Sequence, residues 1–197
     1  MEITTKKIKL VAYALYVLLL VAFVGAALAT PFLAFQSKEL AYKSYDMFAP
    51  TCHQKLSRSQ CIFRDTNGAY SFGDCTPQNG VFVENDGRQI TSVRDGTIGY
   101  KVPICARDVA LYGAMLLAAF IYPFVKKWDD PHVPPAIYFV LAIVPLGIDG
   151  AWQLLGTLNL VAPYESTNLI RTITGVIAGV AATWYIIPII MNLINRD

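Results

Sequence analysis

Apolar residues fall into four long blocks separated by polar segments. The first block covers residues 10–35 and contains no charged residue; the others cover residues 104–125, 135–161 and 168–194. About 20 helical residues cross a hydrocarbon core of roughly 30 Å. Backbone polar groups inside lipid must be paired within the segment that carries them. The pattern therefore predicts an all-α membrane protein with four transmembrane helices.

The first block has a competing interpretation as a cleaved signal peptide. Lysines precede it, and Ala27-Leu28-Ala29 resembles a cleavage site. The apolar regions of signal peptides are roughly 7–15 residues long, whereas this block is much longer. We therefore expect an uncleaved membrane helix.

Basic residues near the ends of the blocks predict the orientation. Residues 1–9 and the short connection 126–134 are both rich in lysine: Lys6, Lys7, Lys9, Lys126 and Lys127. The positive-inside rule places such segments in the cytoplasm. We expect a multi-pass protein of the plasma membrane with both termini in the cytoplasm. Residues 36–103 and the short loop 162–167 would then lie outside.

Residues 36–103 have the composition of a small folded cap. They contain four turn signals, Asn67-Gly68, Asn79-Gly80, Asp86-Gly87 and Asp95-Gly96, each typical of a tight turn. Short alternating runs at residues 69–72, 81–83 and 88–91 lie between them, and the last two flank residues 84–87. These features predict one or two β-hairpins in an extracytoplasmic cap.

The segment from Ser37 to Phe48 is compatible with a short amphipathic helix. We expect its apolar side chains to rest on the membrane surface: Leu40, Tyr45, Met47 and Phe48.

The overall composition agrees with a membrane protein. Hydrophobic residues make up 55% of the 197-residue chain and charged residues only 15%, whereas soluble domains carry about a quarter charged residues. The net charge of +2 argues against binding to nucleic acid. The lipid bilayer is the partner that the composition predicts.

All four cysteines fall on the predicted outer side, where disulfides can form. Four cysteines allow three pairings, and the spacing favours Cys61–Cys75 together with Cys52–Cys105. One interpretation is that both bonds simply stabilise the cap.

A second interpretation is a metal site. Cys52 and His53 form one cluster, and Cys105 and Asp108 form another. Sulfur and imidazole ligands suit zinc or copper, and a carboxylate can complete the set. A third interpretation is a redox-active thiol pair beside His53 and Arg107, because nearby positive charge lowers the pKa of a thiol. The metal site and a Cys52–Cys105 disulfide exclude one another.

Charged residues inside membrane helices are the second line of evidence for a site. Asp149 lies within the third block, with Gln153 one turn further along. Arg107 opens the second block, and Asn168 and Arg171 open the fourth. Such residues face the bundle interior and mark functional sites, although an ion-pair network that only fixes the helix register is equally consistent. Antiparallel helices would bring Arg107, Asp108, Arg171 and Asp149 towards one layer beneath the outer surface.

Several short elements resemble an uncharacterised family of small prokaryotic polytopic membrane proteins. They occur in the family's order: Cys52-His53-Gln54 followed by Arg58-Ser59, then Pro103-Ile104-Cys105-Ala106-Arg107, then Asp149-Gly150-Ala151-Trp152-Gln153, and finally Asn168 through Gly175 with Arg171 between them. The resemblance covers roughly residues 47–180 and implies a shared site, but no activity.

The chain departs from the family pattern in two places. Asp108 stands where the family commonly has a second cysteine, so a metal site that used both cysteines would be altered here. A long insertion before Pro103 brings Cys61 and Cys75 with it. The resemblance thus implies a local Cys61–Cys75 disulfide and a shared site that includes Cys52, His53 and Cys105.

Together these features predict a polar site at the outer membrane boundary. We expect it to bind a metal or small ligand, with hydrolytic or thiol chemistry as an extension. Its polar members would be Gln54, Arg107, Asp149, Gln153, Asn168 and Arg171. The alternative is a non-catalytic accessory subunit that packs against other membrane subunits of a respiratory or monooxygenase-type complex. A transporter is a weaker third option, since four helices leave little room for a pathway.

Overall fold

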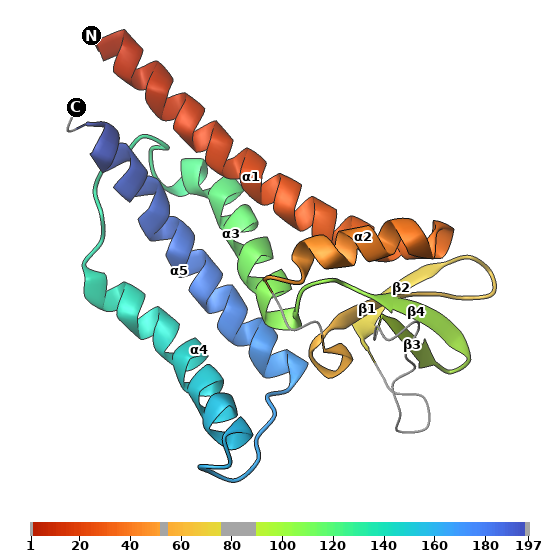
Figure 1. The fold of residues 1–197 in the computed structure, drawn as a ribbon. Coiled ribbons are helices and arrows are strands. Elements are labelled where there is room, and N and C mark those ends of the chain that lie inside the picture. The colour runs from red at the N-terminus through yellow and green to blue at the C-terminus, as the bar shows by residue number, and fades with distance from the viewer. Residues whose placement is uncertain (1, 52–54, 76–89, 196–197) are drawn as a thin grey trace. The chain divides into compact units, whose positions relative to one another are not determined.

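The four apolar blocks are helices. The computed structural model describes residues 2–51, 55–75 and 90–195. Its long helices are α1 (Glu2–Gln36), α3 (Ala106–Val125), α4 (Ala136–Thr157) and α5 (Asn168–Ile194) (Figure 1). Each is long and apolar enough to cross a membrane, which confirms the prediction of four candidate spans.

Three helix ends differ from the predicted bounds by two residues or more. α1 begins at Glu2 rather than at residue 10, because lysine is itself a good helix former. α3 begins at Ala106 rather than at residue 104. α4 ends at Thr157, although the apolar run continues to residue 161.

The end of α4 is a Schellman motif. Asn159 adopts a left-handed conformation with a φ of 57°. Its N–H donates to Gly156, and the N–H of Leu160 donates to Leu155. Both bonds satisfy carbonyls that the helix end leaves unpaired. Asparagine tolerates this conformation better than most residues, so it stops the helix despite the apolar residues that follow.

The described chain forms two compact units, and the first comprises Met1–Phe23 and Arg107–Asp197. In this unit, α3 and α5 lie in backbone contact. A β-carbon built at Gly175 would lie 2.5 Å from the carbonyl oxygen of Arg107, and one at Gly179 would overlap that of Leu111. One turn further along α5, Thr183 Oγ1 donates to the carbonyl of Met115 at 3.1 Å. Small residues at four-residue spacing therefore make a close helix contact of the kind that is common between membrane helices.

Side-chain contacts give the helix directions in this unit. Tyr13 donates to the carbonyl of Ala119 at 2.6 Å, and the ring of Phe23 lies against that of Tyr112, so α1 runs antiparallel to α3. The remaining core residues of the unit lie along the same contacts: Leu20, Met115, Ala119, Tyr122, Ile187 and Met191. These contacts hold the start of α1 and the ends of α3 and α5 at one end of the unit.

The second unit, Val24–Ala106, contains a four-stranded antiparallel sheet. Its strands are β1 (Gln60–Arg64), β2 (Tyr70–Asp74), β3 (Thr91–Arg94) and β4 (Thr97–Lys101), in the order β2-β1-β4-β3. Two hairpins, β1–β2 and β3–β4, are joined through pairing of β1 with β4. An isolated hairpin is marginal in water, and four strands with an apolar face are not. The two observed hairpins thus form one sheet, whose extracytoplasmic position stays a prediction.

Two of the predicted turns connect the paired strands. Asp95 and Gly96 both have positive φ between β3 and β4, and Gly68 has a φ of 84° between β1 and β2. These conformations match the right-handed twist of the paired strands. The predicted hairpin around residues 84–87, with its run at 81–83, lies outside the described residues.

Two further elements complete this unit. α2 (Lys38–Phe48) follows Ser37, whose side chain accepts from the N–H of Leu40 as an N-cap, and the short 3-10 helix η1 (Leu56–Arg58) precedes β1. Tyr45 and Phe48 are buried, so the expectation that they rest on the membrane was wrong. Tyr45 instead donates to the carbonyl of Lys101 at 2.6 Å.

The predicted Cys61–Cys75 disulfide is present in this unit. Both cysteines belong to a buried cluster with Leu56 and Phe63. The bond therefore joins the two strands of the β1–β2 hairpin to the core beneath them.

Candidate functional site

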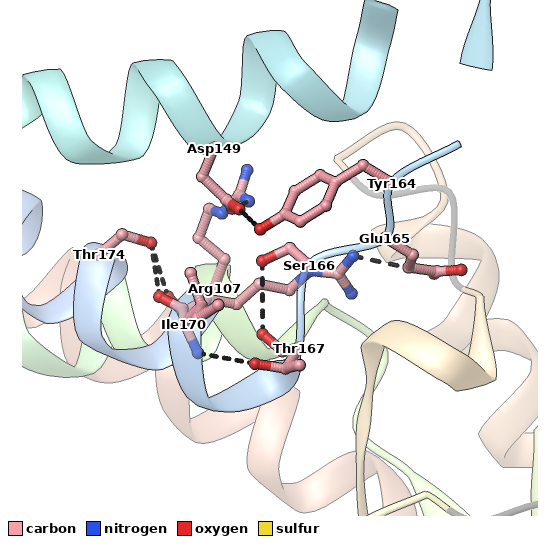
Figure 2. A network of polar contacts seen from close by, with 9 residues as sticks. Arg107, Asp149, Tyr164, Glu165, Ser166, Thr167, Ile170 and Thr174 are labelled. Atoms are coloured by element: carbon pink, nitrogen blue, oxygen red, sulfur yellow. Dashed lines mark hydrogen bonds and ion pairs between the residues drawn. The ribbon is translucent and has the colours of Figure 1, made fainter. Parts of the chain in front are cut away.

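The centre of the candidate site is an ion pair between α3 and α4. Arg107, in the first turn of α3, pairs through its guanidinium with Oδ2 of Asp149. The hydroxyl of Tyr164 donates to Oδ1 of the same carboxylate at 2.9 Å (Figure 2). Both oxygens of Asp149 are thus engaged. Its side chain is only 6% exposed, so the two donors compensate the loss of water around it.

Glycines of α4 and α5 lie where Arg107 and Tyr164 pack against these helices. The backbone of Arg107 lies on α5 at Gly175, while its side chain passes Gly150 of α4, where a β-carbon would lie 3.6 Å from the guanidinium. A β-carbon at Gly156 would lie 3.0 Å from the backbone nitrogen of Tyr164. The connection after α4 therefore folds back over the end of that helix and brings Tyr164 to Asp149.

Arg171 forms a second charged pair at the start of α5. Its side chain is 2% exposed, and its guanidinium lies 3.8 Å from Oε1 of Glu165, whose side chain is 52% exposed. The two partners differ sharply: the arginine is held inside the unit, whereas the carboxylate reaches it from the exposed connection. Removing the carboxylate alone would leave a buried charge without this partner, so an anion that takes its place must bind as Glu165 leaves.

The first turn of α5 is fixed by its own polar groups. Thr167 caps the helix by accepting from the N–H of Ile170, and Thr174 Oγ1 donates to the carbonyls of Ile170 and Arg171 (Figure 2). Asn168 and Ser166 are buried beside this turn. These bonds hold the backbone that carries Arg171.

The structure brings several of the predicted site residues near one another, while their role as a site stays a prediction. Arg107 and Asp149 come together, and Gln153, Asn168 and Arg171 are buried in the same unit. The carbonyl of Gln153 accepts from Thr157 at 2.9 Å. Sequence reasoning missed Tyr164 and Glu165, because a tyrosine and a glutamate in a short loop carry no motif. Their position directly after Pro163 and before the polar start of the fourth block was the only signal.

The predicted metal ligands are divided between described and undescribed parts of the chain. Cys52, His53 and Gln54 lie outside the described residues. Cys105 is half-buried just before α3, and Asp108 lies in its first turn. Within residues 2–51, 55–75 and 90–195, no group of three or more His, Cys, Asp or Glu side chains could hold a metal ion. The zinc or copper site and the Cys52–Cys105 disulfide both stay predictions.

The part of the chain that carries this geometry matches a known family model. Residues 97–185 match the family described as "Predicted membrane protein (DUF2085)". This segment is therefore similar to that family of membrane proteins. The matched segment includes Arg107, Asp149 and Arg171, and thus three of the four sequence elements on which the resemblance rested.

A curated relative supports the same assignment. The chain is 41% identical over 98 residues to the uncharacterized protein MJ1492 of Methanocaldococcus jannaschii. The match covers 50% of this chain and 59% of the relative, so the chain spans about three fifths of the length of the curated relative it matches. No solved structure matches the chain. These similarities indicate a class of membrane protein and no activity.

Proposed function

We propose that this integral membrane protein binds a small ligand with an anionic group at the Arg171 end of its helical unit. The observation that carries the proposal is the pairing of a buried guanidinium with a half-exposed carboxylate at 3.8 Å. A buried charge inside a membrane protein is costly and is normally retained for a function. An incoming carboxylate or phosphate can take the place of Glu165 and make the bidentate contact that arginine favours.

The neighbouring residues support this function in different ways. Both oxygens of the Asp149 carboxylate are paired within the Arg107–Asp149–Tyr164 group, so we assign this carboxylate the role of fixing the helices that surround the ligand. The start of α5 adds backbone N–H groups and a dipole that favour an anion. Arg171 is therefore the binding residue, and Asp149 is a positioning residue.

The test is native mass spectrometry of the protein purified directly from its own membrane. We expect the wild-type chain to carry a bound species and Arg171→Gln to lose it. Glu165→Gln removes the competing carboxylate and should raise the bound fraction. Asp130→Asn, in the loop between α3 and α4, is the matched control for the loss of one carboxylate. A wild-type chain with no bound species, or equal occupancy in all variants, would contradict the proposal.

We place this site at the outer face of the plasma membrane, with both termini in the cytoplasm. The basic residues of segments 1–9 and 126–134 support this orientation. Reporter enzymes fused to either terminus and to the connection at residues 162–167 test it. The result against it would be an active periplasmic-type reporter at a terminus. Other membrane chains in the same native spectra would favour the accessory-subunit alternative, with the charged pairs as purely structural contacts.

We also keep the metal site as a separate proposal. Its ligands would be Cys52, His53, Cys105 and Asp108, and their soft donor set suits zinc or copper. Metal analysis of purified protein should find bound metal that is lost in His53→Ala and retained in His132→Ala, which changes the other of the two histidines. Protein without bound metal, or equal metal in both variants, would argue against this site.

A further inference from the structure

An exposed apolar patch lies on the second unit. We call it the aromatic patch, and it consists of Phe32 from α1, Tyr70 and Phe72 from β2, and Ile98 from β4. Their exposed fractions range from 38% for Phe32 to 54% for Phe72. Several large apolar side chains exposed together mark a contact surface, whereas one alone would not.

The strand register places three of these side chains on one face of the sheet. Arg64 of β1 lies opposite both Tyr70 and Ile98, and Ile62 lies opposite Phe72. Successive residues of a strand point to opposite faces. Ser71 and Gly73 therefore point away from the patch, and β2 alternates aromatic residues on one side with small or polar residues on the other.

Ring contacts join the patch to the last turn and a half of α1. The ring of Tyr70 lies 5.1 Å from that of Phe32 and 5.6 Å from that of Phe35, both in edge-on geometry. Phe35 makes a similar contact with Tyr100 at 4.8 Å. α1 is a candidate span from Thr4 to Gln36 with a mean hydropathy of 2.5. The contacts thus hold β2 at the level where a membrane-crossing helix ends.

The chemistry of the patch fits the lipid interface better than a second protein. Arg64 lies in the middle of the apolar face, with its guanidinium 5.6 Å from the centre of the Tyr70 ring. A dry protein interface would bury this charge, whereas lipid phosphates can pair with it. β2 is also one of the two edge strands among the described strands. Its outer backbone groups need water or headgroups, which the hydrocarbon core does not supply.

We propose that the β1–β2 hairpin is a membrane-interface element that inserts the aromatic patch among the headgroups and upper acyl chains of one leaflet. Aromatic residues are enriched at this depth because their rings sit between polar and apolar surroundings. The hairpin anchors the sheet beside the end of α1. The proposal is independent of the ligand site.

Spin-label accessibility in nanodiscs of phosphatidylcholine and phosphatidylglycerol tests the proposal. A label is attached to a keto amino acid at position 72 in one variant and at position 71 in the other, so that the native cysteines are unchanged. Both positions are exposed, and matching unfolding midpoints would confirm that both variants fold. We expect position 72 to collide more often with oxygen than with a water-soluble nickel complex, and position 71 to show the reverse.

Three results would overturn the proposal. The nickel complex could reach position 72 as readily as position 71, which would place the patch in water. Neither reagent could reach position 72, which would mean that protein covers it. The spectrum at position 72 could show dipolar broadening that disappears on dilution with unlabelled chain, which would identify a second copy as the occupant.

Discussion

The contact between α3 and α5 makes the sharpest stability prediction. Replacing Gly175 with alanine adds one β-carbon at 2.5 Å from the carbonyl oxygen of Arg107 and 3.1 Å from the β-carbon of Ala110. Ordinary contacts begin near 3.4 Å, so the helices must separate by about 1 Å at this point. Overpacking of this kind costs about 1–3 kcal/mol. Because Arg107 carries the central ion pair, the same displacement also disturbs the candidate site.

The matched control is Gly113→Ala on α3, where an added β-carbon meets no atom within 4 Å. Both changes gain the same helix propensity, about 1 kcal/mol relative to glycine in soluble helices. Unfolding in mixed micelles with increasing sodium dodecyl sulfate measures the difference between them. We expect Gly175→Ala to unfold at a clearly lower dodecyl sulfate fraction. Equal unfolding of the two variants would refute the close backbone contact.

Three further predictions follow from single contacts. Asp149→Asn leaves a largely buried arginine without its charge partner, so the same assay should show a loss of about 3 kcal/mol; wild-type stability would contradict the ion pair. Serine at Cys61 and Cys75 together opens a loop with a sequence separation of 14, and unfolding should lose about 3 kcal/mol; an unchanged midpoint would contradict it. In the loop after α3, the N–H of His132 donates to Asp130 at 2.9 Å and, as the largest cause, lowers the pKa of that carboxyl. The bond therefore adds loop stability above the ordinary carboxyl pKa of 3.8 and loses it as pH falls through the lowered value. The ratio of the wild-type exchange rate of the position-132 amide to that in Asp130→Asn should therefore rise only as the pH falls through the lowered pKa. A ratio that does not change with pH would contradict this.

The sequence was most informative where one physical requirement dominates. Twenty or more apolar residues in a row have few alternatives to a membrane helix, so the spans were predictable. The same logic placed Arg107 and Asp149 in one polar layer, because a charge inside lipid needs a partner, but it did not assign them to each other. The end of α4 was not predictable from hydropathy, because Asn159 stops the helix through backbone conformation while apolar residues continue.

In the cap, local sequence predicted a turn but not the pairing of distant strands. Asp95-Gly96 predicted its turn correctly because two consecutive residues with positive φ suit few other sequences. The pairing of β1 with β4 joins residues almost 40 positions apart, and no local pattern encodes such a pairing. Tyr45 illustrates the same point: its amphipathic helix was predicted, but only the folded sheet reveals that its hydroxyl reaches the carbonyl of Lys101 and that burial raises its pKa.

The sequence predicted only some residues of the proposed ligand site. Arg171 was expected to be functional, but its partner Glu165 depends on how the connection after α4 folds back at Gly156. Tyr164 reaches Asp149 through the same fold. Loop geometry of this kind follows from tertiary contacts, so it cannot be predicted from a loop sequence that contains no motif.

A crystal structure of wild-type protein, purified from its own membrane without exchange of bound molecules, is the most direct test of the ligand site. We expect electron density for a non-protein group within hydrogen-bond distance of the Arg171 guanidinium, with Glu165 turned away. A guanidinium enclosed entirely by side chains of the protein itself, with Glu165 still in contact, would rule out the ligand site.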